Sequence, residues 1–326
     1  MRLVLFATLL MFAACNQKKN QEKQSAPTDY TASSEVQQQI KVEDIAKHLN
    51  YLASDEMKGR DTGSPEIERA AAYISTHFSE NGVQPYFSSY YDTLQNYDGL
   101  AYNVVGLVPG QNKESNEFIL IGAHYDHIGV MKPLENSTDS IGNGANDNAT
   151  GTTVVMELAR YFGANPPQER SLIFALFSAE EKGLRGSKHL AQKLKSEDMN
   201  LPLMLNFEMM GIPMNHDDYS TYVTGYNKSN LAELVNEVAQ KPLAGFLETA
   251  ESFNLFRRSD NAPFYDEFGI PAHTFSSFDF TNFDFYHKAG DEPSLMNPEF
   301  MTEMTNEFIP VIESFANRSE LAVKMN

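Results

Sequence analysis

The stretch FILIGAHYDH, residues 118–127, joins an apolar run to a polar cluster. A short, uncharged apolar run of this kind is typical of a buried β-strand. His124 and Asp126 come at its end, two positions apart, so their side chains would project to the same side of an extended backbone. This spacing suits a metal-binding imidazole whose other nitrogen is oriented by a carboxylate. His127 is a less certain participant, because a histidine after a strand is more often hydrogen bonded at the surface.

Strands and helices are expected to alternate on both sides of this stretch. Apolar runs predict further strands at 103–108, 171–178, 203–207, 220–224 and 270–275. Helical spacing of apolar residues predicts helices within 36–52, 64–82, 152–162, 187–194, 230–239 and 299–323. The alternation predicts a single α/β domain from residue 34 to 326, a three-layer sandwich. Its mixed, mainly parallel β-sheet would carry helices on both faces.

Composition limits the classes of protein and of site. The 326 residues are 41% hydrophobic and carry a net charge of -19, from 44 acidic and 25 basic side chains. These values exclude a polytopic membrane protein and a mostly disordered one, and the acidic excess argues against a nucleic-acid partner. The chain has 1 cysteine, which excludes an internal disulfide and a cysteine-rich zinc site. Any metal would therefore be bound by His, Asp and Glu.

The first residues indicate export. Arg2 precedes an apolar run over 3–14 that is too short to span a bilayer and is typical of a secretory signal, residues 1–14. Small residues directly before Cys15 resemble a bacterial lipobox, although Phe12 is unusual there. Cys15 would then be a lipidated N-terminus, and the polar residues 15–33 a flexible tether. We expect a lipid-anchored protein of the bacterial cell envelope, outside the cytoplasm, that touches the membrane only through its lipid.

Further polar clusters follow the other strands. Asp147 lies in GANDNATG, residues 144–151, where it could either cap the next helix or bridge two cations. Glu180 and Glu181 close the strand at 171–178. On extended backbone adjacent side chains point in opposite directions, so one carboxylate could bind a metal while the other transfers a proton. Glu208 follows the strand at 203–207. In the last cluster, at 286–291, Asp291 follows His287 by four residues and could orient it.

The order of these clusters resembles the M28 family of zinc peptidases, as does the upstream stretch GRDTGS, residues 59–64. The resemblance implies a pair of zinc ions bridged by Asp147, with a cis peptide bond between Asp147 and Asn148. His124 and Glu208 would complete one zinc site, and Glu181 and His287 the other. Glu180 would be the general base, and Asp126 and Asp291 would support the ligands from behind.

Two positions leave alternatives open. Glu208 stands where the family usually has Asp, and its longer side chain could bind differently or leave only one tight zinc. His273 is the rival of His287 for the last ligand. It lies inside the apolar run at 270–275, however, where a hydrogen-bonded core histidine is the more common finding.

The resemblance implies hydrolysis of an amide. Two cations would polarise the carbonyl and lower the pKa of a shared metal-bound water from about 15.7 toward 7, and Glu180 would move its proton to the leaving amine. A carboxylate-rich cleft suits the amine of a peptide substrate with a free N-terminus, so an aminopeptidase is expected. The alternatives are a carboxypeptidase or dipeptidase using Arg257 and Arg258, a one-zinc glutaminyl cyclase, and a non-catalytic receptor. Residue preference and oligomeric state are not indicated.

Overall fold

The structure is a computed structural model that describes residues 39–326, apart from residues 134 and 136. The proposed signal, Cys15 and the tether lie outside the described residues. The strands are β1 (Gln84–Pro85), β2 (Tyr91–Thr93), β3 (Tyr102–Val108), β4 (Glu117–His124), β5 (Gly129–Val130), β6 (Ile141–Gly142), β7 (Ser171–Phe177), β8 (Asn200–Phe207), β9 (Thr221–Val223), β10 (Ala244–Gly245) and β11 (Ala272–Ser276). The helices are α1 (Val42–Leu52), α2 (Pro65–Glu80), α3 (Gly151–Ala164), α4 (Arg185–Ser196), α5 (Leu231–Ala239), α6 (Glu248–Ser252), α7 (Asn261–Phe268) and α8 (Pro298–Asn317).

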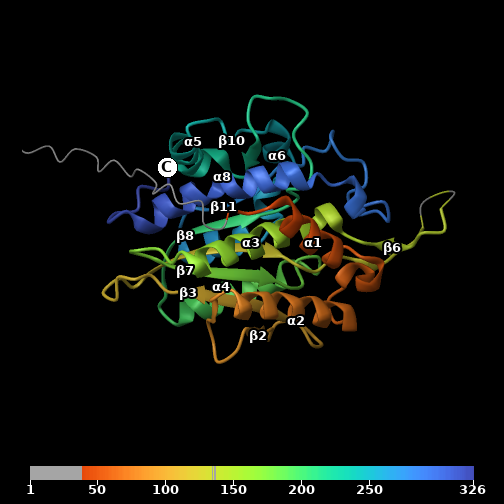
Figure 1. Ribbon diagram of the computed structural model, residues 1–326, viewed down its shortest axis with the longest axis horizontal. Coiled ribbons are helices and arrows are strands. Elements are labelled where there is room, and N and C mark those ends of the chain that lie inside the picture. The colour runs from red at the N-terminus through yellow and green to blue at the C-terminus, as the bar shows by residue number, and fades with distance from the viewer. Residues whose placement is uncertain (1–38, 134, 136) are drawn as a thin grey trace, which may run out of the picture. The chain divides into compact units, whose positions relative to one another are not determined.

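A mixed nine-stranded sheet lies at the centre of the described chain (Figure 1). Its strand order is β1-β3-β7-β4-β8-β11-β9-β10, and β2 pairs with β3. The pairs β4–β7, β4–β8 and β8–β11 are parallel, whereas β3 and β9 run antiparallel to their neighbours β7 and β11. The predicted α/β class with a mainly parallel, mixed sheet is confirmed.

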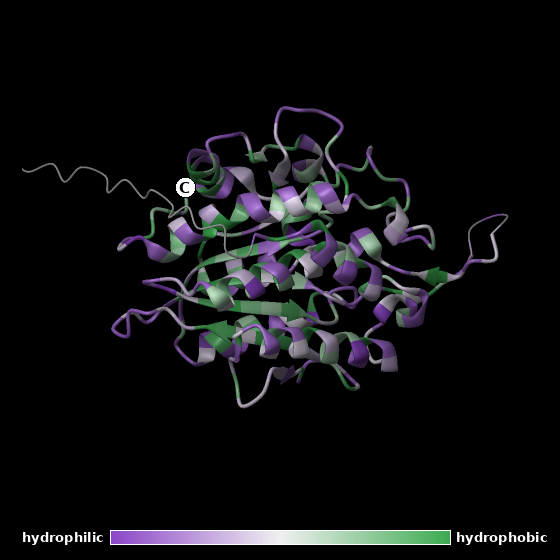
Figure 2. Ribbon diagram, viewed as in Figure 1, coloured by the Kyte–Doolittle hydropathy of each residue, from purple (hydrophilic) through white to green (hydrophobic). Residues whose placement is uncertain are grey.

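Side chains alternate between two cores because both faces of the sheet are covered. In β7, Leu172 and Phe174 belong to the core under α1, α2, α3, α5 and α8, while Ile173 and Phe177 belong to the core under α4 and α7. Figure 1 shows α3 and α8 crossing in front of the strands, and Figure 2 shows the strands in the green of hydrophobic residues. This two-sided burial explains the continuous apolar runs in the sequence.

The predicted elements differ from the structure mainly at their ends. The last helix stops at Asn317 rather than at residue 323, because Arg318-Ser319-Glu320 offers no apolar side chain to bury. Val323 still packs into the core, beside a bridge between Ser229 and Met325. Helix α7 was not predicted, since Pro263 interrupts a short segment without a clear helical pattern.

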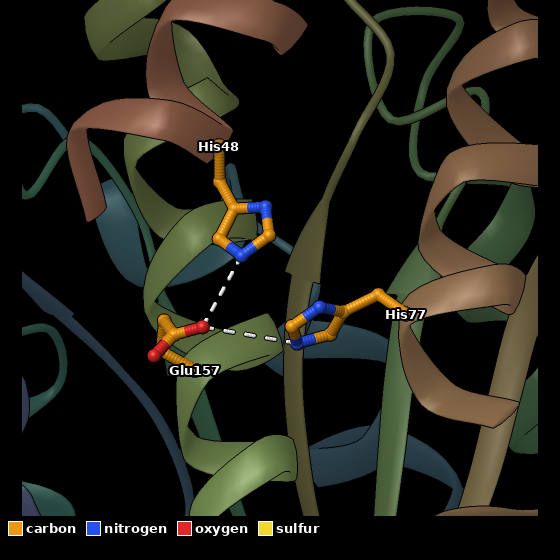
Figure 3. Close-up of side chains that lie close together, drawn as sticks. All are labelled: His48, His77 and Glu157. Carbon is orange, nitrogen blue, oxygen red and sulfur yellow. Dashed lines mark hydrogen bonds and ion pairs between the residues drawn. The ribbon is translucent and has the colours of Figure 1, made fainter. Parts of the chain in front are cut away.

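A buried polar cluster joins three helices on one face of the sheet (Figure 3). Glu157 of α3 is fully buried, and its Oε1 accepts a hydrogen bond from His48 Nε2 of α1 at 3.2 Å. The same oxygen lies 3.8 Å from His77 Nε2 of α2, which donates to the carbonyl of Met156 at 3.1 Å. Arg160 Nε donates to the other oxygen of Glu157 at 2.8 Å. Both oxygens of Glu157 and the Nε2 atoms of His48 and His77 thus have protein partners, so the cluster is a hydrogen-bonded connection between α1, α2 and α3.

This connection makes stability depend on pH. Burial, and after it the neighbouring His48, lowers the pKa of His77 from 6.5 to about 4. A histidine with a depressed native pKa stabilises the fold above its unfolded pKa, and that stability is lost as the pH falls toward the native value. We expect His77 to account for a loss of about 2 to 3 kcal/mol in the free energy of unfolding between pH 6.5 and 4.

Urea denaturation of wild type and His77→Asn at pH 7 and pH 4.5 measures this contribution. Loss of bound metal at low pH acts on both proteins. The difference between their changes in free energy of unfolding from pH 7 to pH 4.5 therefore isolates the contribution of His77. Equal changes in the two proteins would contradict the assignment.

Among the described residues, no helix combines the length and apolarity needed to cross a membrane.

Candidate metal centre

The ends of neighbouring parallel strands form one side of the candidate site. β4 ends at His124, β7 leads into Glu180 and Glu181, and β8 leads into Glu208. Because these three strands are parallel, their carboxyl ends meet at the same edge of the sheet. The loop that follows β11 brings His287 to this edge, where its Nε2 lies 3.2 Å from Glu181 Oε1.

Asp147 lies in the turn Ala145–Thr150, directly before α3, and its two oxygens face different histidines. Oδ1 is 3.3 Å from His124 Nε2, and Oδ2 is 3.1 Å from His287 Nε2. Donor atoms of His124, Asp147 and Glu208 lie within 4.8 Å of one another. The structure thus brings the five predicted ligands together, with Asp147 shared between two donor sets.

The residue after Asp147 ties this turn to the end of β8. The Asp147–Asn148 peptide bond is cis, as the resemblance implied. Asn148 Nδ2 donates to the carbonyl of Phe207 at 3.0 Å, and Asn148 Oδ1 accepts from the backbone N–H groups of Gly151 and Met209, each at 3.0 Å. The position of Asp147 is therefore set by an amide whose nitrogen and oxygen are both hydrogen bonded and which joins two elements.

Asp291 holds the same turn from the other side. Its carboxylate accepts from the backbone N–H groups of Asn146 at 2.7 Å and Asp147 at 3.0 Å. Burial raises the pKa of this carboxyl from 3.8 to about 6. The sequence suggested that Asp291 orients His287. In the described chain it instead positions the backbone of Asp147.

Asp126 supports the two glutamates. Its carboxylate accepts from the backbone N–H groups of Glu180 at 3.1 Å and Glu181 at 3.3 Å, and from the hydroxyl of Thr62 at 3.0 Å. His124 Nδ1 donates to the backbone carbonyl of Asp126 at 3.1 Å, whereas the carboxylate is 3.7 Å away. His124 is therefore oriented by the main chain of Asp126, and the side chain of Asp126 sets the turn that carries Glu180 and Glu181.

Arg60 is a structural residue of the site that the sequence indicated only as part of the stretch 59–64. Its fully buried guanidinium donates to the carbonyls of Tyr125 at 2.9 Å, Asn143 at 2.8 Å and Gly144 at 2.9 Å. These carbonyls belong to the segment after β4 and to the start of the Asp147 turn. Arg60 therefore fixes the two ligand-bearing segments relative to each other.

Glu208 reaches the His124 donor set with its longer side chain. Its backbone N–H donates to the carbonyl of Phe275 at 3.0 Å, and the hydroxyl of Ser259 donates to its Oε2. Ser259 also accepts from Asn206 Nδ2 at 2.9 Å. Burial, and then the charge of Asp147, raises the pKa of Glu208 from 4.5 to about 7. One oxygen of Glu208 is thus held by Ser259, and the other can serve a cation.

The electrostatics of the site favour a bound cation. Burial alone would lower the pKa of His287, but its contacts with Asp147 and Glu181 raise it from 6.5 to about 10. Burial would raise the pKa of Asp147, yet the imidazoles of His124 and His287 hold it well below its usual range. The group therefore has a strongly negative potential, which a divalent cation would neutralise.

The donor atoms fit zinc. His124 Nε2 and Glu181 Oε1 are buried and have no hydrogen-bond partner, and the same is true of both ring nitrogens of His127. In the described residues, neither nitrogen of His48 nor of His77 is left in this way. Buried polar groups normally have partners, and imidazole with carboxylate is a usual ligand set for zinc. Sequence reasoning did not include His127 among the ligands.

His273, the rival of His287, is a core residue. It is 1% exposed in β11, where its Nε2 is hydrogen bonded to Ser229 Oγ at 2.8 Å and its Nδ1 donates to the carbonyl of Thr224 at 2.8 Å. Both nitrogens are therefore used away from the donor sets.

A cavity of about 420 Å³ opens over the donor atoms. Asp147, Glu180, Glu181, Glu208 and His287 lie on one part of its wall. The apolar part consists of Met209, Tyr222, Leu255, Phe278, Phe280 and Tyr286, and the cations are Lys188, Arg257 and Arg258. The ends of the strands therefore open into a space of suitable size for an amino-acid side chain.

Comparison with protein families gives a match to the model of peptidase family M28 over residues 103–312. Among curated proteins, the chain is 38% identical over 109 residues to a probable zinc metalloprotease of Pyrenophora tritici-repentis, covering 33% of this chain and 22% of the relative. It is 24% identical over 228 residues to leucine aminopeptidase 1 of Paracoccidioides brasiliensis, covering 65% and 56%. The chain thus spans about a fifth of the length of the metalloprotease that it matches.

Solved structures share the fold. The Legionella pneumophila aminopeptidase LapA aligns with a TM-score of 0.67 at 22% identity, covering 86% of this chain and 73% of that one. A glutaminyl cyclase of Bacteroides thetaiotaomicron bound to N-acetylhistamine aligns with a TM-score of 0.62 at 17% identity, covering 85% and 98%. At these identities the alignments establish the architecture of the chain.

Proposed function

Because the chain belongs to peptidase family M28, we propose that it is a zinc-dependent aminopeptidase that removes N-terminal residues from peptides. The observation that carries this proposal is the pair of donor sets that share Asp147, with Glu180 beside them in the cavity. One set consists of His124, Asp147 and Glu208, and the other contains Asp147, Glu181 and His287. Two complete sets support two zinc ions per chain.

When bound, such metals polarise a scissile carbonyl and make water a stronger acid. The residues of this chain would supply the remaining chemistry. Glu180 would take the proton of the attacking water and pass it to the departing amine. The carboxylate of Asp126 accepts a hydrogen bond from the backbone N–H of Glu180 at 3.1 Å. This bond fixes the position of Glu180 in the turn beside Glu181.

The cavity supports a substrate with a free N-terminus. Its carboxylates favour a cationic α-amine, and its apolar wall of Met209, Phe278, Phe280 and Tyr286 favours a large apolar first side chain. The two donor sets favour hydrolysis over the one-zinc cyclase alternative, although glutaminyl cyclases share the architecture. Arg257 is paired with Asp266, which leaves it less suited to bind a substrate carboxylate.

A substrate panel tests the proposal. Purified chain is incubated with leucyl, phenylalanyl and aspartyl reporter amides, their N-acetylated forms and a peptide with N-terminal glutamine. Cleavage of the unblocked apolar reporters, none of the acetylated ones, and loss of activity with a chelator are expected. Release of ammonia from the glutamine peptide without cleavage of any reporter would instead establish a cyclase.

The envelope location is a proposal that rests on the sequence of residues 1–33. Cys15 would carry the lipid, and the mature chain would be held outside the cytoplasm, on a bacterial membrane, through that lipid alone. We expect wild type to partition into the detergent phase of a bacterial lysate. Cys15→Ser should move the chain to the aqueous phase, and an unchanged partition would contradict lipidation at this residue.

A further inference from the structure

We propose that His127 is a fourth protein ligand of the second metal, beside Asp147, Glu181 and His287. This inference rests on the metal centre of the proposed function and extends it. The second position would then be bound by two imidazoles and two carboxylates of the chain. The first position, with His124, Asp147 and Glu208, would keep room for substrate.

The distances at the second position match a four-coordinate zinc. His127 Nδ1 lies 3.1 Å from Glu181 Oε1 and 3.9 Å from Asp147 Oδ2. His287 Nε2 lies 3.2 Å and 3.1 Å from the same two oxygens. Zinc bonds of about 2.0–2.1 Å in a tetrahedron place neighbouring donor atoms about 3.3–3.4 Å apart. Three of these four separations are within a few tenths of an ångström of that edge, and the fourth is within reach of a small adjustment.

The ring nitrogens of His127 are not used by any other group among the described residues. Its side chain is 0% exposed, and neither ring nitrogen has a hydrogen-bond partner. Glu181 Oε1 therefore lies close to Nδ1 of His127, but the two atoms do not have the geometry of a hydrogen bond. Two potential metal ligands that face each other at this distance without hydrogen-bond geometry are typical of atoms directed at a common cation. Buried His48 and His273 contrast with this, since each is hydrogen bonded through both nitrogens.

The backbone around the ring is shaped to admit it. A Cβ atom at Gly144 would lie 2.5 Å from His127 Cγ and 2.6 Å from its Cδ2. Gly144 has a φ of 59°, and a Cβ atom at Gly142 would lie 3.5 Å from His127 Cδ2. The ring is thus held by close packing against glycine backbone. Packing of this kind fixes the direction of Nδ1 without using either nitrogen.

The two imidazoles of this position differ in their exposure to solvent. The side chain of His287 is 38% exposed, whereas that of His127 is inaccessible to solvent. His287 can therefore be displaced by solvent or substrate more easily than His127. We expect the second metal to be the tighter of the two, since four protein ligands hold it and one of them is shielded completely.

Metal titration of the purified, folded chain tests the proposal. Metal-free wild type, His127→Phe and His127→Asn are titrated with Zn²⁺ against a chromophoric competitor, with folding checked by circular dichroism. We expect wild type to bind two equivalents, and the tighter dissociation constant to weaken at least about tenfold in both variants. His48→Asn, which also removes a buried imidazole next to a carboxylate, is the matched control and should bind zinc as wild type does.

X-ray absorption of zinc-loaded wild type provides a second measurement that needs no variant. The proposal requires three imidazoles shared by two metals, whereas ligation without His127 requires two. A fit to two imidazoles, or folded His127 variants with wild-type affinity at both sites, would overturn the inference. If the variants do not fold, the imidazole count decides.

The two proposals can fail separately. A wild-type chain that cleaves no reporter, yet binds its tighter zinc through His127, would remove the proposed activity and leave this ligand assignment. An active chain whose zinc binding is independent of His127 would remove the assignment and leave the activity.

Discussion

Glu180→Gln is expected to lower kcat for an unblocked aminoacyl reporter by about two to four orders of magnitude while zinc stays bound. Glutamine has nearly the shape of glutamate but cannot accept a proton from water at neutral pH. Glu180 lines the cavity, and it belongs to neither donor set found in the described residues. The variant should therefore lose proton transfer and keep its metals.

The adjacent glutamate provides the matched control. Glu181→Gln changes the same turn by the same atom, but Glu181 Oε1 lies 3.2 Å from His287 Nε2 and belongs to the second donor set. We expect this variant to lose affinity for zinc as well as activity. Zinc content after gel filtration, measured together with kcat, separates the two residues. Near-normal turnover by Glu180→Gln would rule out Glu180 as the base.

The sequence predicts different roles for these neighbours from extended-strand geometry, in which successive side chains point in opposite directions. In the structure β7 ends at Phe177, so Glu180 and Glu181 lie in the turn after the strand, and their separate roles stay a prediction. Sequence order did place His124 and Glu208 at one edge, since both follow apolar runs that form parallel strands. Sequence order thus predicts which residues meet when they follow regular strands and the strands are neighbours in the sheet.

The supporting contacts could not be predicted, because they depend on turn geometry that has no periodic pattern. Asp126 lies two residues from His124, yet its carboxylate binds the backbone of Glu180, and it is a main-chain carbonyl that orients His124. The sequence makes His127 only a less certain participant, because a histidine after a strand is more often hydrogen bonded at the surface, but its ring is fully buried against Gly144. The only sequence signal for His127 was its place directly after Asp126 in a cluster that already had a ligand.

Asp147→Asn is expected to have the largest effect on metal binding, because Asp147 is the one residue common to both donor sets in the described chain. Its Oδ1 faces His124 and its Oδ2 faces His287. An amide has a single oxygen, and the hydrogens of its NH₂ group would point toward one of the two metals, which that group cannot bind. We expect the affinity for both zinc ions to fall by at least about a hundredfold, with loss of measurable turnover.

Comparison with Glu208→Gln distinguishes a bridge from a ligand of one metal. Glu208 belongs only to the His124 set, so its loss should release one zinc and spare the tighter one, whereas Asp147→Asn should release both. The Asp147 turn itself should persist in the variant, because Asp291 holds the backbone N–H of residue 147 rather than its side chain. If Asp147→Asn kept one zinc at wild-type affinity, the two sites would be independent. The mechanism would then have to be carried by a single metal beside Glu180.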